Sequence, residues 1–201
     1  LQFVFVEGHS TDSTLREIIH TQAVHNKRNI WAYRQQCIGK ADAIWLGLRA
    51  ALGEIIIILD ADLTVRPEEL PRFYHIAAEG KFANGTRFKS PMQDGAMPAL
   101  NKIANRWFAK RMSAVLGVQI TDALCGTKAF PRELQPARIV DPFSDFSLLF
   151  GAAKAGMPIV DVPVHYMRRV YGKPQISRFR DGFTLLRSMR AGTRMMKCGA
   201  P

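Results

Sequence analysis

Residues 54–63 read EIIIILDADL, and the rest of the chain is organised around this stretch. Residues 55–59 are all aliphatic, and four of the five are isoleucines. A run without polar alternation is typical of a strand buried on both faces, as in a parallel sheet under helices. Burying each such side chain is worth about 1.5–3 kcal/mol, enough to hold the segment at the middle of a core. The stretch therefore predicts the central strand of an α/β sheet.

Two carboxylates, Asp60 and Asp62, follow the aliphatic run directly. The carboxyl ends of strands are where open α/β sheets bind their ligands. A carboxylate is costly to hold at such an edge unless a cation shares the site. We therefore expect the pair to serve a ligand site. The alternative is a helix cap and turn, because the Pro-Glu-Glu of residues 67–69 opens a helix just after it.

Strand-like and helix-like segments alternate along the sequence, which predicts an α/β domain with a mainly parallel sheet. A first helix, capped by Thr11 or Asp12, runs to about residue 25, and a second follows residues 39–42 and ends at residue 53. The remaining expected helices are residues 67–79, 100–117, 145–155 and 179–197. The expected strands are residues 1–6, 29–34, 55–59, 81–87 and 157–164, with a turn and strand over residues 122–130.

Length and composition limit the class of protein. A chain of 201 residues is long enough for one sizeable domain and too short for two of ordinary size. With 47% hydrophobic and 22% charged residues it falls in the globular range. Its three cysteines lack metal-site spacing, so we expect a reducing compartment without a disulfide framework. No apolar stretch reaches the roughly 18 residues of a transmembrane helix, and no signal peptide is evident.

The net charge of +11 is concentrated near the C-terminus. Residues 165–201 carry nine Lys or Arg and one Asp. This excess implies an anionic partner: a phosphorylated substrate, lipid headgroups or nucleic acid. Residues 100–117 and 179–197 are amphipathic, with basic and aromatic side chains on their polar faces. Such helices either pack flat on the domain or lie on a membrane surface, and both interpretations stay open.

Motifs along nearly the whole chain resemble glycosyltransferase family 2, the inverting enzymes with a GT-A fold. Within that family, the sequence is most similar to the dolichol-phosphate mannose synthase and polyprenyl-phosphate glycosyltransferase branch. The matching segments occur in the family's order: FVEGHSTDST at residues 5–14, Gly39-Lys40, LDADL with the P-E-x-L-P that follows it, NGTR at residues 84–87, DALCGTKAF at residues 122–130, and DFSLLFGAAKAGMPIVDVPV at residues 145–164.

The resemblance implies a Rossmann-like three-layer GT-A sandwich with a mostly parallel central sheet, plus C-terminal amphipathic helices. We expect residues 1–175 to form the GT-A domain and residues 176–201 to form a basic amphipathic helix. The family normally begins with a P-x-Y-N-E strand and a helix, and this sequence begins one strand later. We therefore expect an N-terminally incomplete domain, either a fragment or a divergent form. Two departures from the family motifs are Glu7-Gly8-His9 in the first turn and Ser147 in place of an acid.

The resemblance also implies a divalent cation at the donor site. Mg²⁺ or Mn²⁺ held by Asp62, with Asp60 close by, would neutralise the charge that builds on the leaving diphosphate. In the family, Asp60 more often faces the ribose or donor sugar. From the residues alone, a helix cap for Asp12 and a solvated Lys40 are the competing interpretations. The residues assigned to nucleotide-sugar binding are Glu7, Asp12, Lys40, Asp60, Arg87 and Lys173.

On the acceptor side the resemblance implies catalytic roles for Asp145 and Arg169. For hydroxyl acceptors an acid near Asp145 acts as general base, which contributes about 10²–10⁴-fold. A lipid phosphate would need no base, and Asp145 would then only position groups. A charge placed by the helix dipole is the alternative. Arg169 and Lys173 resemble the loop that closes over the diphosphate, where an Arg fork can bind two phosphate oxygens.

Together these features predict an inverting, metal-dependent glycosyltransferase. We expect it to move a sugar from a UDP- or GDP-sugar to polyprenyl phosphate, in the cytoplasm at the inner face of the membrane. Its contact with the membrane would be peripheral, and we expect no nucleic-acid partner. One alternative is a non-catalytic basic module that retains the sheet and binds nucleotides or nucleic acid. Another is a GT-A nucleotidyltransferase, against which DALCGTKAF and the VPVHYMRR of residues 162–169 argue.

Overall fold

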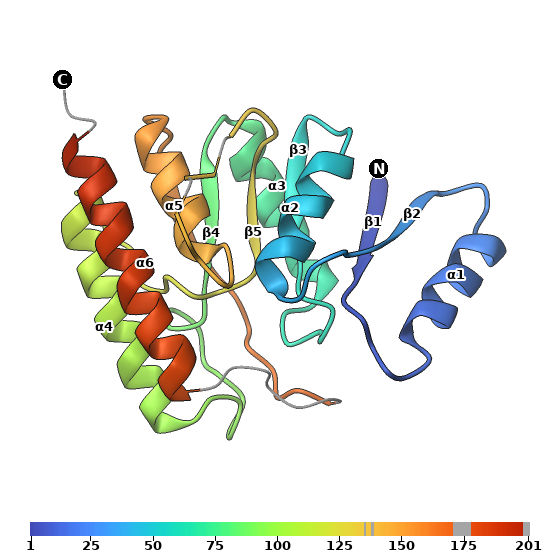
Figure 1. Ribbon diagram of the computed structural model, residues 1–201, viewed down its shortest axis with the longest axis horizontal. Helices are drawn as coiled ribbons and strands as arrows, with labels where there is room; N and C mark the ends of the chain where they lie inside the picture. Colours follow the sequence, from blue (N-terminus) through green and yellow to red (C-terminus); the bar gives the residue numbers. More distant parts are fainter. Residues whose placement is uncertain (135, 138, 171–177, 199–201) are drawn as a thin grey trace.

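The computed structural model describes residues 1–134, 136, 137, 139–170 and 178–198. Strands and helices alternate along these residues, as Figure 1 shows, so the expected α/β class is confirmed. Each expected element is present within a few residues of its expected bounds. In chain order the elements are β1 (Gln2–Glu7), α1 (Thr14–Val24), β2 (Asn29–Arg34), α2 (Lys40–Ala50), β3 (Ile55–Ile58), η1 (Pro67–Glu69), α3 (Leu70–Ala78), β4 (Phe82–Thr86), α4 (Ala99–Leu116), β5 (Lys128–Pro131), α5 (Asp145–Lys154), β6 (Ile159–Pro163) and α6 (Arg178–Cys198).

The strands of the described residues form two sheets instead of one mainly parallel sheet. Strands β1 and β2 pair in parallel with each other. The other four strands have the order β3-β5-β4-β6. Because β5 runs antiparallel to both β3 and β4, while β4 and β6 are parallel, this sheet is mixed. The expectation of a mostly parallel central sheet is therefore corrected.

Strand β3 lies at the edge of its sheet, not at the centre as predicted. Only Ile56 of its four residues is buried, and the others are half-buried. The aliphatic run correctly indicated a strand with an apolar side chain on each face. It carried no information on edge pairing, because hydrogen bonding across a strand edge involves the backbone and leaves no side-chain pattern.

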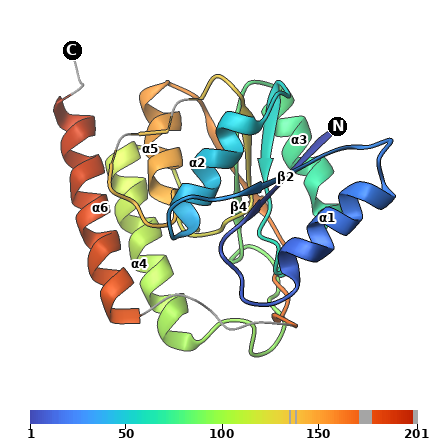
Figure 2. The same cartoon turned by 45° about the vertical axis from the view of Figure 1, so that its right-hand side comes forward.

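Two hydrophobic cores cover the two faces of the four-stranded sheet, with α3 over one face and α4, α5 and α6 beyond the other (Figure 2). Successive side chains of a strand point to opposite faces of the sheet, so each strand contributes to both cores. Phe82 and Phe130 stack at 5.5 Å between ring centroids on the α5 face, whereas their neighbours Ala83 and Ala129 face α3. The result is a helix–sheet–helix arrangement of three layers, as expected for this fold class.

Helix α6 packs against α5 and α4 through Leu185 and Met189. A Cβ built at Gly192 would lie 2.0 Å from Cε2 of Phe150, so the helices touch closely there. Within the part of the chain that is described, no helix combines the length and the apolar character needed to cross a bilayer.

Candidate active site

Asp60 and Lys40 meet at the carboxyl end of β3. Lys40 is the first residue of α2 and follows Gly39, whose φ of 117° turns the chain into the helix. The Lys40 Nζ lies 2.7 Å from Oδ1 and 3.0 Å from Oδ2 of Asp60. Burial by itself lowers the pKa of Lys40, but Asp145 and Asp60 outweigh it and raise that pKa above its ordinary value. Two of the predicted donor-site residues are thus brought together as an ion pair.

Asp62 lies on the same turn but faces a different cation. Its Oδ1 accepts hydrogen bonds from the backbone N–H and the hydroxyl of Thr64, at 3.0 and 2.8 Å. Its Oδ2 accepts a hydrogen bond of 2.5 Å from Arg169. The turn is held by Leu63 in the left-handed region, with φ of 54°, a strained conformation of the kind that clusters at functional sites. Asp62, predicted for the sugar-donor site, is therefore in direct contact with Arg169, predicted for the sugar-acceptor side.

This turn could bind a divalent cation only together with further ligands that the side chains in the described part of the chain do not supply. The described residues contain no group of three or more His, Cys, Asp or Glu that could hold a metal by themselves. Mg²⁺ and Mn²⁺ accept carboxylate, phosphate and water oxygens and need few protein carboxylates. Asp62 and Asp60 supply oxygens of this kind. Because each is ion-paired here, a cation would have to replace Arg169 and Lys40 as their partners.

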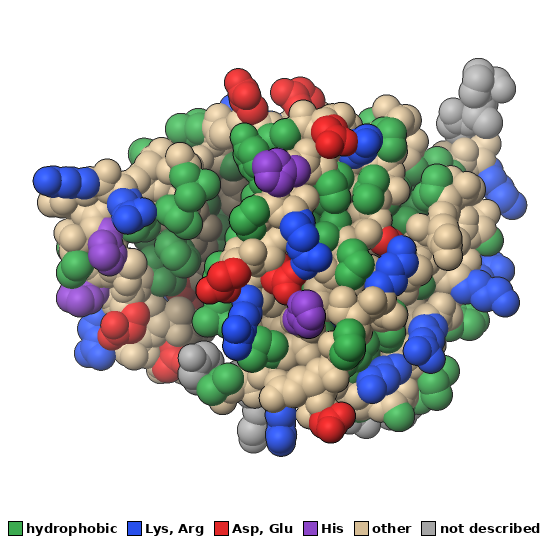
Figure 3. Space-filling model, turned by 180° about the vertical axis from the view of Figure 1, so that it is seen from behind, with side chains coloured by type: hydrophobic (Ala, Val, Ile, Leu, Met, Phe, Trp, Pro, Cys, Tyr) green, Lys and Arg blue, Asp and Glu red, His purple; other side chains and the backbone are tan. Residues whose placement is uncertain are grey.

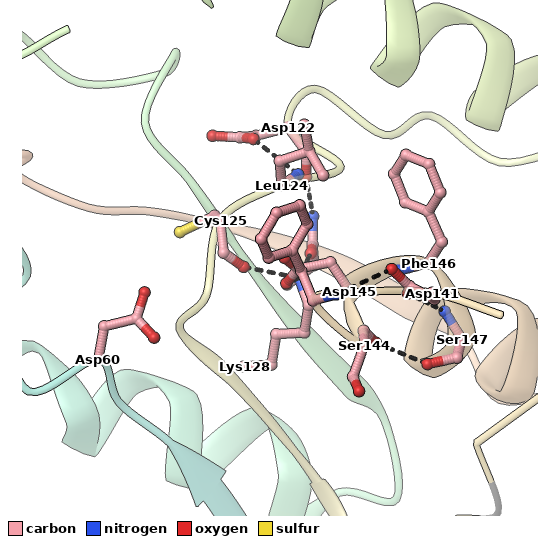
Figure 4. Close-up of polar contacts among 12 residues, drawn as sticks. Asp60, Asp122, Leu124, Cys125, Lys128, Asp141, Ser144, Asp145, Phe146 and Ser147 are labelled. Carbon is pink, nitrogen blue, oxygen red and sulfur yellow. Dashed lines mark hydrogen bonds and ion pairs between the residues drawn. The ribbon is translucent and has the colours of Figure 1, made fainter. Parts of the chain in front are cut away.

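The candidate base Asp145 begins α5 and is 4% exposed. Its Oδ1 lies 3.3 Å from Nζ of Lys128, a residue of β5 that is fully buried. Burial raises the pKa of Asp145, and the positive charges of Lys128 and Lys40 oppose that rise without cancelling it. Figure 4 shows Asp60, Cys125, Lys128 and Asp145 around this region. A carboxylate with a raised pKa binds a proton more readily than an ordinary carboxylate does.

The start of α5 is capped by Asp141, not by Asp145. The Asp141 Oδ2 accepts the backbone N–H groups of Phe146 and Ser147, at 2.8 and 2.9 Å. Ser144, with φ of 62°, then turns the chain so that Asp145 faces β5. Asp141 thus accepts two of the free N–H groups at this helix start, while Asp145 pairs with Lys128.

Glu7 and Asp12 lie at the two ends of the first turn. Glu7 is buried, accepts a hydrogen bond from the backbone N–H of Ser10, and has its Oε2 3.4 Å from Nε of Arg34. The Ser10 hydrogen bond is the main cause of a lowered Glu7 pKa. Asp12 is exposed and accepts the N–H of Thr14 at 3.0 Å.

The expected helix cap is wrong in detail, because Ser13 occupies the cap position before α1 and neither Thr11 nor Asp12 does. Asp12 instead stabilises the turn one residue further out. It also lines an open pocket of about 290 Å³ against β1, together with Phe5 and Ile18. This pocket contains none of the residues around Asp60 and Asp145.

Arg87 has a different partner from the one expected. Its guanidinium forms a bidentate ion pair with Asp122, with Nε–Oδ2 of 2.6 Å and Nη2–Oδ1 of 2.9 Å. Both residues are buried, and the ring of Tyr166 stacks 5.2 Å from the guanidinium carbon. The fork is therefore occupied by Asp122, and the expected donor contact is corrected to a structural one. Lys173 lies outside the described residues.

Two residues of the site were assigned no role from the sequence. Lys128 and Gly126 both belong to the DALCGTKAF segment, which was recognised as a motif without roles for these two. A Cβ built at Gly126 would lie 2.3 Å from Oδ2 of Asp60 and 2.6 Å from Nζ of Lys40. The usable signal was a lysine in an otherwise apolar strand, since a lysine is almost never fully buried without a partner.

Solved structures with a similar fold include two kinds of sugar-phosphoglycerate synthase. Glucosyl-3-phosphoglycerate synthase from Mycobacterium tuberculosis, in complex with UDP, matches with a TM-score of 0.64 and 17% identity over 95% of this chain and 68% of that one. The same enzyme in complex with Mn²⁺, UDP-glucose and phosphoglyceric acid matches with a TM-score of 0.64 and 16% identity, with coverage of 95% and 68%. Mannosyl-3-phosphoglycerate synthase from Rubrobacter xylanophilus gives 0.65 and 16%, covering 98% of this chain and 65% of that one.

The chain thus spans about two thirds of the length of these proteins. At 16–17% identity, the TM-scores of 0.64 and 0.65 show a shared fold. The profile of the family described as "Glycosyl transferase family 2" matches residues 1–135. Since this match covers well over half of the sequence and includes Glu7, Lys40, Asp60 and Asp62, the chain belongs to glycosyl transferase family 2 and is a glycosyltransferase of GT-A fold.

Proposed function

We propose that the chain is an inverting, metal-dependent glycosyltransferase that takes its sugar from a UDP- or GDP-sugar and transfers it to a polyprenyl phosphate. The observation that carries the proposal is the grouping of Asp60, Lys40 and Asp145 beside the Asp62 turn. An anionic donor needs cations at this edge. Lys40 and Arg169 supply two, and a divalent cation bound by Asp62 would add Lewis-acid stabilisation of the leaving diphosphate.

A membrane position for the acceptor is supported by the arrangement of α4 and α6. Their amino-terminal ends lie at the same end of the molecule as the loops that follow β3, β4 and β6, as Figures 1 and 2 show. Leu100, Ile103 and Trp107 of α4 and Phe183 of α6 are exposed. A lipid-linked acceptor at a cytoplasmic membrane face would place the reacting phosphate close to the Asp62 turn.

A second acceptor class, a hydroxyl next to a phosphate, is favoured by a different observation. The raised pKa of Asp145 suits a base that removes a proton, whereas a phosphate acceptor is already an anion and needs no base. Glucosyl-3-phosphoglycerate synthase was solved with a compound of this class, phosphoglyceric acid. Assays with both acceptor classes, using UDP-glucose and GDP-mannose as donors, separate the two.

The central test is titration of UDP and GDP with and without Mn²⁺, followed by the Asp62→Ala variant. We expect metal-linked nucleotide binding and loss of transfer in Asp62→Ala, with unchanged circular dichroism. Transfer by Asp62→Ala at the wild-type rate in Mn²⁺ would contradict the metal role. Binding of nucleotide and of other polyanions that is independent of metal and strongly weakened by salt would instead support the non-catalytic basic module.

A further inference from the structure

Lys128 is a fully buried lysine whose ammonium group is surrounded by three acceptors. Its Nζ donates to the backbone oxygen of Cys125 at 2.7 Å and to Oδ1 of Asn84 at 3.0 Å, and lies 3.3 Å from Oδ1 of Asp145. An ammonium group has three hydrogens to donate and cannot accept a hydrogen bond, so these three partners use its whole hydrogen-bonding capacity. A buried cation is tolerated only with this degree of compensation.

The hydrogen bonds around Lys128 continue into the core of the sheet. Asn84 on β4 donates from its Nδ2 to the backbone oxygen of Asp122 and to Oδ1 of Asp161, both at 2.9 Å. Its amide oxygen therefore points at Lys128 in a fixed orientation. This places the ammonium at one position, and among the described residues Asp145 is the carboxylate within ion-pair distance of it. Side-chain networks of this kind hold each member more rigidly than a pair would.

The charges of four groups from different segments of the chain act on Asp145. These are Lys128 from β5, Lys40 from α2, Asp141 from the loop before α5, and Asp60 after β3. The two lysines are held by different partners, Lys40 by Asp60 and Lys128 by Asn84. Lys40 is partly exposed, whereas Lys128 is fully buried.

We propose that Lys128 is a positioning residue, which fixes the carboxylate of Asp145 beside the Lys40–Asp60 pair from the buried side of the site. The proposal deepens the proposed function and rests on it for its catalytic consequence. Lys128 itself is fully buried and does not touch a substrate. Its contribution is to keep Asp145 ionised and aimed at the acceptor, which matters both for a base and for a group that only orients the acceptor.

The test is Lys128→Met, which keeps the aliphatic stem and removes the charge. Loss of a neighbouring cation disfavours the ionised carboxylate, so the Asp145 titration should move to higher pH. We would follow the ¹³C carboxyl resonance of Asp145, assigned with Asp145→Asn, against pH. In parallel, the acid limb of kcat should move in the same direction, and kcat near pH 6 should fall about tenfold or more, since a base contributes about 10²–10⁴-fold. KM for the sugar nucleotide should stay within about threefold.

Lys81→Met is the matched control, because Lys81 also pairs with a carboxylate, Glu79, but at the start of β4 and away from the site. It should change neither the Asp145 resonance nor the pH profile. If Lys128→Met does not fold, Lys128→Gln replaces it, since its amide can still donate to Cys125 and Asn84 but carries no charge, and it should shift the titration in the same direction. An unshifted Asp145 titration in a folded variant overturns the proposal. Absence of transfer by the wild type would overturn the proposed function alone, because the resonance titration needs no substrate.

Discussion

At the scale of single residues, the site depends on Gly126, a glycine of the DALCGTKAF motif to which the motif assigned no role. Gly126 lies over the Lys40–Asp60 pair, in the space that a side chain would fill. The neighbouring atoms are the ends of two side chains, so a larger residue would displace the ion pair before it disturbed the backbone. Catalysis tolerates such displacement poorly, since a shift of about 1 Å can cost roughly 10²-fold in rate.

Gly126→Ala should therefore keep the fold and lose activity. The added Cβ would lie 2.3 Å from Asp60 Oδ2, and the pair would separate or move. We expect sugar transfer to fall by about 10²-fold with a nearly unchanged unfolding temperature. Gly53→Ala is the control, because the nearest atom to its new Cβ is 3.5 Å away. Equal activity of the two variants would show that the position of the pair is unimportant.

Glu7 gives a prediction about the pH dependence of stability. Its folded-state pKa is lowered from the ordinary value of 4.5, mainly by the Ser10 backbone N–H, with a smaller contribution from Arg34. A lowered pKa stabilises the fold above the unfolded-state value, and that stabilisation is lost as the pH falls through the folded-state pKa. Glu7→Gln should thus lower the free energy of unfolding at pH 7 and have progressively less effect below pH 4.5. Urea unfolding at pH 7 and pH 3 measures this, and a difference that grows on acidification would contradict the assignment.

At the scale of elements, α6 is fixed by close contact with α5. Gly192 meets the ring of Phe150, and the Ser188 hydroxyl on the same face lies within hydrogen-bond distance of the backbone oxygens of Val140 and Thr184. The glycine lets the helix approach where any other side chain would collide. This explains how a helix rich in Arg, read from sequence as open to either packing or membrane contact, packs on the domain along one face.

Gly192→Ala should push α6 away from α5. Its Cβ would lie 2.0 Å from Phe150 Cε2, and overpacking of this kind costs about 1–3 kcal/mol. In the same helix, nothing lies within 4 Å of a Cβ at Gly182. Gly182→Ala should therefore stabilise by about 0.5–1 kcal/mol, the usual gain for Gly to Ala within a helix. Thermal unfolding of both variants checks the opposite signs, and two variants of the same sign would be inconsistent with this packing.

At the scale of the whole molecule, charge is distributed unevenly. Figure 3 shows Lys and Arg side chains gathered on the side formed by α4 and α6. Exposed basic residues there include Lys110, Arg111, Arg187 and Arg190, next to the exposed Trp107. At an anionic bilayer each basic residue contributes about 1 kcal/mol, so this is the side at which the proposed membrane contact would be made.

Replacing Arg187 and Arg190 by Gln should weaken binding to vesicles that contain anionic lipid. A loss of about 2 kcal/mol corresponds to roughly 30-fold in the partition constant. Lys27→Gln with Arg28→Gln removes the same charge from exposed positions between α1 and β2, and should have a much smaller effect. Co-sedimentation at low salt measures both. Equal losses from the two double variants would indicate a non-specific attraction and no membrane-facing side.

The sequence by itself determined the order and type of the elements and the family. Runs such as residues 55–59, the turn residues between them and the spacing of Asp60 and Asp62 are local, and local patterns depend on neighbours in the chain. It also named Lys40, Asp60 and Asp145, which the structure places together, through motifs that the family shares.

Only the tertiary structure decided what these residues face. The edge position of β3, the pairing of Arg87 with Asp122 and that of Asp145 with Lys128 join segments up to dozens of residues apart. Such pairings depend on which backbones and buried charges must satisfy one another once the chain is compact. A lysine in a strand and an arginine after a strand carry no mark in the sequence of the carboxylate that each will meet.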